Sequence, residues 1–315
     1  MSHPVHDRFA RARGPAVAPV RNVGVVALAA IAAIVGAIQL AAPEPAAAVA
    51  GLQRTFSHSQ LTGPEPVKQA TAECPNGKHV IGGGAVVHDG GRKLVRLTWL
   101  IPWTPPTPGD PRKDGYYVTA EAPNLSSNYN WYVTAFAVCA DKGDTLSGYT
   151  IKQDWTDVSS SGGPFAQTSA RCRSGTVAYG TGAAIFTSGA DPSGQGQIGL
   201  QLTRTSGPLD ISRATARESA SGYGAAWQLV SYAVCAERRG QIHAEGTIAP
   251  AATATDACDS GRTHGPGGGG GLTDGGPVWL QEIYPFPTLN AVRVDLTGPL
   301  YPSIGGMVAH QTCAQ

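Results

Sequence analysis

The stretch CPNGKHVIGGGAVV, residues 74–87, places three consecutive glycines inside a run that otherwise reads as a β-strand. A phosphate-binding loop would need a G-x-x-x-x-G-K-[ST] or G-x-G-x-x-G pattern between a strand and a helix. Lys78 follows Gly77, but no Ser or Thr comes next and no helical pattern follows. Glycines inside a strand instead mark a bulge, a sharp bend or the close approach of another backbone. We therefore interpret the three glycines as part of a scaffold.

The same pattern occurs three times along the chain. The three blocks open with CPNGKHVIGGGA, CRSGTVAYGTGA and CDSGRTHGPGGG, and they close with NWYVTAFAVCA, AAWQLVSYAVCA and GGMVAHQTCA. Counted from the opening cysteine, two positions are glycine in every block: Gly77, Gly175 and Gly261, then Gly84, Gly182 and Gly268. Two further strand-like runs lie between the opening and the closing of each block. We expect three repeats of four strands, over about residues 51–142, 143–240 and 241–315.

The six cysteines predict disulfide bonds. An even number of cysteines in an exported chain indicates disulfides, and the absence of C-x-x-C spacings disfavours zinc ribbons and thioredoxin-like chemistry. Each block begins and ends with a cysteine, so the simplest pairing lies within blocks: Cys74–Cys139, Cys172–Cys235 and Cys258–Cys313. Each bond would close a loop of roughly 60 residues and stabilise the fold by about 4 kcal/mol in the chain-entropy model.

Residues 1–50 have the organisation of a secretory signal peptide. A basic segment precedes the apolar run of residues 23–40, and Ala48-Val49-Ala50 forms an A-x-A cleavage site. We expect cleavage between Ala50 and Gly51 and a secreted, extracellular product. The alternative is a membrane anchor formed by uncleaved residues 23–40, whose length approaches that of a membrane span.

The charge balance excludes some classes of partner. Residues 1–50 hold four of the 23 basic and two of the 22 acidic residues, so residues 51–315 carry a net charge of −1 with histidines neutral. A nearly neutral chain lacks the basic footprint expected of a protein that binds nucleic acid or an anionic membrane. We expect no nucleic-acid partner, and no membrane association after cleavage.

The strand-like alternation predicts an all-β fold. Helical patterns are almost absent, and Gly and Pro mark the turns. Three repeats that bury their apolar faces on a common axis would form one β-prism-like domain over residues 51–315. The alternative is three tandem small β-sandwiches. The linkers 140–171 and 236–257 contain strand-like pieces, which we expect to connect neighbouring sheets.

The repeats resemble vitelline membrane outer layer protein I. The resemblance covers residues 74–313 as an architecture and is carried by C-P-x-G at Cys74, Pro75 and Gly77, the glycine-rich first strand and the closing cysteine. The second and third blocks depart from it, because Arg173 and Asp259 replace the proline. The resemblance implies a three-sheet β-prism fold that binds or acts on carbohydrate. The chain also resembles secreted proteins of high-GC Gram-positive bacteria with similar cysteine–glycine repeats.

No catalytic motif is present in the sequence. There is no H-E-x-x-H or His/Cys cluster for zinc, no G-x-S-x-G elbow and no S-x-x-K pattern. We expect neither a metal nor a cofactor, and we expect a protein that is not an enzyme. A hydrolase with a dispersed site is the remaining alternative.

The best candidate for a ligand site is a loop found only in the first block. WTPPTPGDPRKDGYY begins at residue 103 and joins two strands, and loops on a rigid scaffold often carry function. Aromatic rings with polar edges can stack on sugar rings. The candidate ligand-binding residues are Trp103, Arg112, Lys113, Tyr116 and Tyr117. We expect a disulfide-stapled binding or structural module, lectin-like toward an extracellular polysaccharide or cell-wall component; the alternative is a protein-binding module or inhibitor.

Overall fold

A computed structural model describes most of the chain after residue 48. The described residues are 49–92, 94–106, 112–122, 129–143, 146–159, 163–187, 197–206, 209–239, 242–249, 253–259, 262–270, 278–298 and 307–314. Every regular element among them is a β-strand, which confirms the all-β class. None of these residues belongs to a helix long and apolar enough to cross a membrane. The predicted signal peptide lies outside the described residues except for its last two.

Within the described residues each repeat contributes six strands: the four expected from its opening to its closing cysteine and two more that precede them. The first repeat holds β1 (Gln53–His58), β2 (Val67–Glu73), β3 (Lys78–His88), β4 (Arg96–Trp103), β5 (Gly115–Glu121) and β6 (Tyr132–Asp141). The second holds β7 (Thr150–Val158), β8 (Phe165–Arg171), β9 (Thr176–Thr187), β10 (Ile198–Ser206), β11 (Ile211–Glu218) and β12 (Trp227–Glu237). The third holds β13 (Ile242–Ala249), β14 (Thr253–Ala257), β15 (Arg262–Gly270), β16 (Trp279–Pro285), β17 (Ala291–Thr297) and β18 (Met307–Ala314).

Of the first two strands of each repeat, β7 and β13 were expected as strand-like pieces of the linkers, whereas β1, β2, β8 and β14 were missed from the sequence. All of them lie at the edges of sheets, and β2 and β8 expose every second side chain to solvent. Edge strands pair on one side only and tolerate polar residues, so their sequences carry a weak strand pattern. They also lack the glycine pattern that marks the third strand of each repeat.

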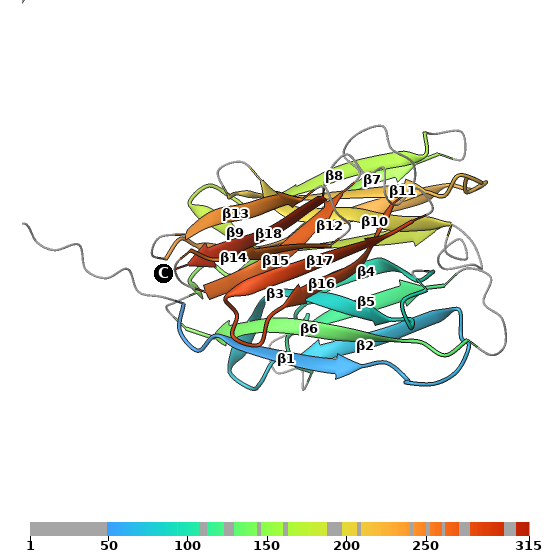
Figure 1. The fold of residues 1–315 in the computed structure, drawn as a ribbon. Coiled ribbons are helices and arrows are strands. Elements are labelled where there is room, and N and C mark those ends of the chain that lie inside the picture. Colours follow the sequence, from blue (N-terminus) through green and yellow to red (C-terminus); the bar gives the residue numbers. More distant parts are fainter. Residues whose placement is uncertain are drawn as a thin grey trace, which may run out of the picture. The chain divides into compact units, whose positions relative to one another are not determined.

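The described strands form three six-stranded antiparallel sheets, and each sheet combines two repeats. The strand orders are β1-β6-β3-β16-β17-β14 in sheet A, β2-β5-β4-β9-β12-β7 in sheet B and β13-β18-β15-β10-β11-β8 in sheet C. Two repeats meet where β3 pairs with β16, β9 with β4 and β15 with β10; Figure 1 shows β16 lying beside β3. The alternative of three separate sandwiches is therefore wrong.

The linkers connect neighbouring sheets as expected: residues 140–171 contribute β7 to sheet B and β8 to sheet C, and residues 236–257 contribute β13 to sheet C and β14 to sheet A. β7 pairs with β12 and β13 with β18, which are the closing strands of their own repeats. The connection between repeats is made by the third strand of one repeat and the fourth strand of another. This exchange is cyclic, because the third repeat pairs with the first across β16 and β3.

All six cysteines form disulfides: Cys74–Cys139, Cys172–Cys235 and Cys258–Cys313. This is the pairing within repeats that the sequence predicted. Each bond joins the residue after the second strand of a repeat to its sixth strand, and those two strands belong to different sheets. The three bonds therefore link sheet A to B, B to C and C to A. A disulfide-stabilised all-β domain fits an extracellular module in an oxidising environment.

Side chains from all three sheets share one hydrophobic core. Leu100 from sheet B, Leu200 from sheet C and Leu280 from sheet A are each fully buried within it. The face of each sheet that is turned away from this core is called its outer face below. Because successive side chains in a strand alternate between faces, each strand contributes half of its residues to an outer face.

The three third strands contact one another through their backbones. β3, β9 and β15 carry equivalent β-bulges, at Ile81, Tyr179 and His264. A glycine follows each bulge. A Cβ atom at Gly82 would lie 2.2 Å from the carbonyl oxygen of His264, one at Gly180 would lie 2.1 Å from that of Ile81, and one at Gly265 would lie 1.9 Å from that of Tyr179. No side chain fits at that distance, so these glycines are scaffold residues.

The remaining repeated glycines have two structural roles. Gly77 and Gly175 adopt φ values of 79° and 85° in the turns before β3 and β9, a region that L-residues with side chains rarely occupy. Gly84 and Gly182 contact the carbonyl oxygens of the neighbouring repeat's fourth strand. Their counterpart in the third repeat is Gly267 instead of Gly268, because its opening segment is one residue shorter.

Replacing Gly180 by alanine tests this packing. The new Cβ atom would meet backbone atoms of Ile81 and Gly82, which cannot rotate away. We expect Gly180→Ala to lower the free energy of unfolding by about 3 kcal/mol, the upper range for overpacked sites. Urea denaturation measures this loss. Gly224→Ala is the matched control, because a Cβ atom added at Gly224 would have no other atom within 4 Å; equal losses in both variants would contradict the packing role.

Candidate functional site

The candidate ligand-binding residues of the first-block loop have different surroundings in the structure. Residues 107–111 of that loop lie outside the described residues. Trp103 ends β4, and the guanidinium carbon of Arg112 lies 5.0 Å from the centre of its ring. The Lys113 amine lies 3.9 Å from a carboxylate oxygen of Glu73, and both side chains are exposed. Trp103 and Arg112 thus lie together, whereas Lys113 belongs to a surface ion pair.

The two tyrosines at the end of the loop point in opposite directions. Tyr116 is 1% exposed, and its hydroxyl donates a hydrogen bond of 2.8 Å to the carbonyl oxygen of Thr181. Burial also raises its pKa. The expectation that Tyr116 binds a ligand is therefore corrected: it is a core residue. Tyr117 is partly exposed on the outer face of sheet B, with its ring centre 5.9 Å from that of Trp99.

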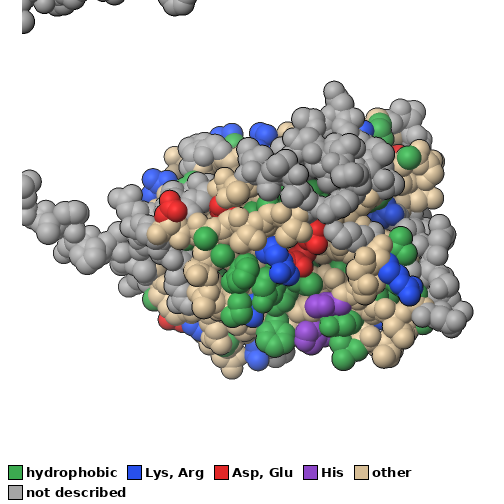
Figure 2. Space-filling model, viewed as in Figure 1, with side chains coloured by type: hydrophobic (Ala, Val, Ile, Leu, Met, Phe, Trp, Pro, Cys, Tyr) green, Lys and Arg blue, Asp and Glu red, His purple; other side chains and the backbone are tan. Residues whose placement is uncertain are grey.

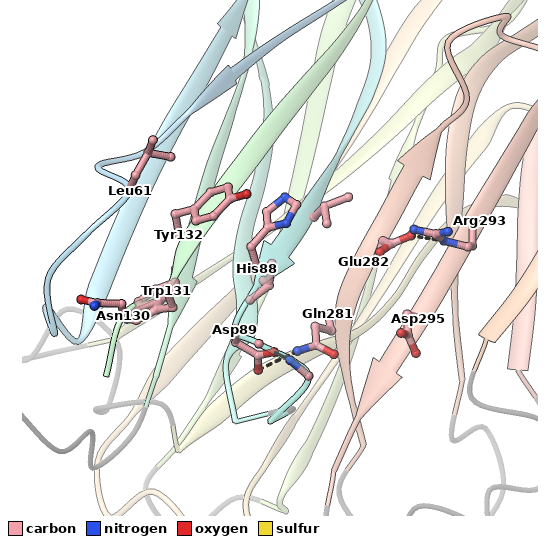
Figure 3. Close-up of a pocket in the computed structure, with 14 residues that line it drawn as sticks. Leu61, His88, Asp89, Asn130, Trp131, Tyr132, Gln281, Glu282, Arg293 and Asp295 are labelled. Atoms are coloured by element: carbon pink, nitrogen blue, oxygen red, sulfur yellow. Dashed lines mark hydrogen bonds and ion pairs between the residues drawn. The ribbon is translucent and has the colours of Figure 1, made fainter. Parts of the chain in front are cut away.

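A different surface combines aromatic and charged side chains. A groove of about 660 Å³ crosses the outer face of sheet A, where β3 and β6 of the first repeat meet β16 and β17 of the third. Figure 3 shows His88 and Tyr132 on one side and Glu282, Arg293 and Asp295 on the other. We call this the sheet A groove. It exists only because strands of two repeats are joined in one sheet.

The aromatic side of the groove is an ordered network around Thr134. The rings of His88 and Tyr132 are stacked, with centres 4.2 Å apart and planes 11° apart. The Thr134 hydroxyl lies 2.8 Å from Nδ1 of His58 and 3.0 Å from Nε2 of His88. Burial, followed by the nearby His58, lowers the pKa of His88, while Asp89 opposes this shift. The stacked pair therefore presents a neutral, fixed ring platform at neutral pH.

The polar side of the groove consists of carboxylates, an amide and an arginine. Glu282 and Asp295 are direct neighbours on paired strands, and Nε of Arg293 donates a hydrogen bond to Oε1 of Glu282. That hydrogen bond is the main cause of a raised pKa of Arg293. Gln281 donates a hydrogen bond of 2.9 Å to Asp89. These groups offer both donors and acceptors to a polar ligand.

Asp89 holds the turn that closes the groove. Its carboxylate accepts hydrogen bonds from the backbone N–H groups of Gly91 and Leu94, at 3.1 and 3.0 Å, as well as from Gln281. Its backbone carbonyl accepts one of 3.0 Å from the hydroxyl of Tyr129. Since Asp89 is only 3% exposed and its oxygens are occupied, it positions the turn and the Gln281 amide.

An aromatic patch continues from the groove along the outer face of sheet A. The ring centres of Phe56 and Phe136, on the paired strands β1 and β6, are 6.3 Å apart. Tyr284 lies on β16, beyond Gly84 of β3, and its ring centre is 5.3 Å from that of Phe136. The guanidinium carbon of Arg54 lies 5.0 Å from the Phe136 ring centre. Phe56 is 58% exposed. Figure 2 shows hydrophobic side chains gathered beside histidine, acidic and basic side chains on this face.

None of the groove residues is among the candidates predicted from the sequence. His88 and Tyr132 belong to the first repeat, whereas Glu282, Arg293 and Asp295 lie about 200 residues further along the chain in the third. Only the pairing of β3 with β16 brings them together. The alternation of Tyr132, Thr134 and Phe136 along β6 was the one available sign that this face carries ring side chains.

The geometry does not point to a metal centre. Among the described residues no group of three or more His, Cys, Asp or Glu side chains lies close enough to hold a metal ion. No protein-family model matches the chain. No curated protein matches it either. The function is therefore argued from the groove itself.

The lowered pKa of His88 predicts that the stability of the domain depends on pH. His88 has a lowered pKa in the folded state, so the unfolded chain binds more protons below the unperturbed histidine pKa of about 6.5. We expect the free energy of unfolding to fall as the pH decreases below about 6.5, and His88→Gln to reduce that loss. Urea denaturation between about pH 7 and 5 measures it.

NMR titration provides an independent check of the effect of His58 on the pKa of His88. The His88 resonance of the wild-type protein should titrate below the unperturbed range. His58→Gln removes a neighbouring positive charge and should raise the pKa of His88. A His88 resonance that titrates in the ordinary range in both proteins would contradict this electrostatic coupling.

Proposed function

We propose that this protein is an extracellular binding module that holds a carbohydrate in the sheet A groove. The observation that carries the proposal is the stacked His88–Tyr132 pair, which faces Glu282, Arg293 and Asp295 across about 660 Å³. A sugar ring has an apolar C–H face and a rim of hydroxyl groups. The groove supplies an aromatic surface for the face and planar polar side chains for the rim.

The resemblance to vitelline membrane outer layer protein I supports the same proposal. That family is thought to bind or act on carbohydrate, and an extracellular polysaccharide or cell-wall component fits a disulfide-bonded exported domain. The resemblance rests on architecture and on few motif residues. The proposal therefore depends on the groove, since fold alone does not determine function.

We propose binding without turnover. A glycosidase needs one carboxylic acid to donate a proton and a second carboxylate to act as nucleophile or base. Here Glu282 accepts a hydrogen bond from Arg293, and Asp89 is occupied by two backbone N–H groups and Gln281. Of the three carboxylates in the groove, Glu282 and Asp89 are therefore arranged as hydrogen-bond acceptors. The proposed role requires no cofactor.

A protein partner is the second candidate, and one observation favours it. The outer face of sheet B exposes 54% of Trp155 and 36% of Phe186, and Trp99 packs 5.1 Å from Phe186 between ring centres. This surface is aromatic but lacks the cluster of carboxylates found in the groove. Exposed aromatic side chains of this kind are common at the centres of protein interfaces.

Substitution of Tyr132 tests the carbohydrate proposal. We expect the wild-type protein to bind at least one of peptidoglycan, chitin and cellulose in a pull-down assay, and free soluble glycan to compete. Tyr132→Ala removes the exposed half of the ring stack and should weaken binding by about tenfold, an effect of ~1.4 kcal/mol. Isothermal titration with the competing glycan measures the change in affinity.

Tyr117→Ala is the matched control, because Tyr117 is a partly exposed tyrosine on the outer face of sheet B. It should bind the glycan as the wild-type protein does. Loss of binding in Tyr117→Ala or Trp103→Ala, with Tyr132→Ala unaffected, would move the site to sheet B and to the first-block loop. If the wild-type protein captures a protein partner in the pull-down assay and Trp155→Ala does not, the result would favour the protein-binding candidate.

We also propose that the chain is exported and that its N-terminal segment is removed. Val49 is 4% exposed and packs in a core cluster with Ile81 and Val138, and the Ala50 carbonyl accepts a hydrogen bond of 3.1 Å from the Asp141 N–H group. Cleavage after Ala50 would remove both contacts. Residues 46–48 also read A-x-A, so a cut after Ala48 would keep them.

Intact mass spectrometry of the secreted protein distinguishes these sites. We expect a chain that begins at Val49, because the buried Val49 side chain stabilises the folded domain. A chain that begins at Gly51 would agree with the site predicted from the sequence and would show that the Val49 contact is dispensable. An uncut chain retained with cells would favour the membrane anchor.

A further inference from the structure

The outer faces of the three sheets differ at one equivalent row of residues. In sheet A this row contains Phe136 and Gly84 on paired strands, followed by Tyr284 and Arg293. In sheet B the same places hold Tyr232, Gly182, Ile101 and Tyr117. In sheet C they hold His310, Gly267, Arg204 and Arg213. Sheet C thus carries two arginines and a histidine in this row, where sheet A carries one arginine and sheet B none.

Arg204 and Arg213 face each other directly on the paired strands β10 and β11. Like charges at directly opposite positions destabilise a sheet unless another group compensates them. Neither arginine makes a hydrogen bond or ion pair with any other described residue, and Nε of each is buried without a partner. Burial, followed by the nearby Arg213, lowers the pKa of Arg204.

Sheet A shows how an arginine in this row is normally compensated. There Arg293 is bonded to Glu282, two residues before Tyr284 on β16. The corresponding position in sheet C, two residues before Arg204, is the fully buried Leu202. The carboxylate has therefore been lost where a second arginine has been gained. The nearby Asp210 is engaged by Arg171, at 3.1 Å.

Two more donors lie on the same face. His310 is 7% exposed, its Nδ1 atom is buried without a partner, and its pKa is lowered to about 4, by burial first and then by Arg204. Thr215 follows Arg213 by two residues, so its side chain points to the same side of β11. It is 1% exposed, and its hydroxyl has no partner. Gly267, which pairs with His310, packs against the Thr203 carbonyl oxygen and so brings β10 close to the His310 side of the sheet.

We propose that the outer face of sheet C binds a phosphate or sulfate group between Arg204 and Arg213, with His310 and Thr215 as further donors. Guanidinium groups bind such oxyanions through paired hydrogen bonds. The donors lie on three strands of one face, β10, β11 and β18, and a tetrahedral anion offers three or more acceptor oxygens to such a set. The bound anion would also remove the repulsion between the two arginines. This site is separate from the sheet A groove and does not depend on its function.

Thermal unfolding with added anions tests the proposal. At constant ionic strength set with sodium chloride, inorganic sulfate and inorganic phosphate should each raise the Tm of the wild-type protein, as expected for a ligand that binds only the folded state. Arg204→Gln and Arg213→Gln should each weaken anion binding at least tenfold and abolish the shift. Without added anion both variants should be as stable as the wild-type protein or more stable, because the repulsion is gone.

Arg171→Gln is the matched control, because Arg171 lies on β8 of the same sheet, is 66% exposed and already has Asp210 as its partner. It should retain the anion response, as should Tyr132→Ala in the sheet A groove. NMR titration adds a second readout, since a bound anion should raise the pKa of His310. The natural anion could be a free ion or a group on a charged polymer, and dextran sulfate, with neutral dextran as control, distinguishes the two. Dextran sulfate that binds more tightly than inorganic sulfate indicates a charged polymer. Equal affinity per sulfate group indicates a free anion.

Two outcomes would overturn the site. One is a wild-type protein whose Tm and His310 resonance respond to neither sulfate nor phosphate beyond the effect of chloride. The other is an anion response that persists in both arginine variants, which would place the bound anion elsewhere on the molecule.

Discussion

The contact between the backbones of β3, β9 and β15 is the constraint on which the rest of the fold depends. At Gly82, Gly180 and Gly265 the neighbouring strand approaches to a distance that excludes any side chain. Each strand reaches this contact after a bulge, which bends it away from its own repeat. The bend directs one edge of each third strand toward the fourth strand of another repeat. The cyclic exchange of strands is therefore a consequence of three bulges and three glycines.

Because strands of two repeats combine in each sheet, the residues of the three outer faces can also differ from one another. Each face is built from two different repeats, so no two faces contain the same pair of sequences. Positions that are equivalent by register carry the ring of Phe136 in sheet A, the ring of Tyr232 in sheet B and the imidazole of His310 in sheet C. The core side of the same strands is mostly apolar, and its buried polar residues, Ser231 on β12 and Gln311 on β18, are hydrogen-bonded inside the domain. A common packing arrangement on the inner side thus permits an aromatic and acidic groove, an aromatic surface and a basic surface on the outer sides.

Much of the architecture was predictable from the sequence because it repeats locally. Cysteines, turn glycines and the alternation along the closing strands recur at similar spacing, and they predicted the all-β class, the disulfide pairs and the scaffold role of the glycines. The edge strands β1, β2, β8 and β14 were missed because they are paired on one side only and carry polar residues. The groove was missed because His88 and Glu282 become neighbours only through a pairing between the first and third repeats. Tyr116 and Tyr117 show why the sequence did not identify the exposed residue within a single strand. Adjacent tyrosines look alike in sequence, but the alternation of side chains along the strand puts Tyr116 in the core and Tyr117 on the outer face.

The pairing between strands of different repeats, called the seam below, helps to explain why the disulfides join different sheets. The pairing of β3 with β16 extends over two residue pairs, Val86 with Glu282 and Ala85 with Ile283, whereas β3 pairs with β6 over nearly its whole length. A short ladder contributes few hydrogen bonds, so the seam is held mainly by the shared core and by connections at its ends. Each disulfide joins two sheets and closes a loop of 55 to 65 residues, which removes much of the entropy that separation of the sheets would gain. The sheet A groove lies across such a seam, and its two sides belong to different repeats. The disulfides that join the sheets therefore also support the two sides of the groove, and they fit a domain placed in an oxidising environment.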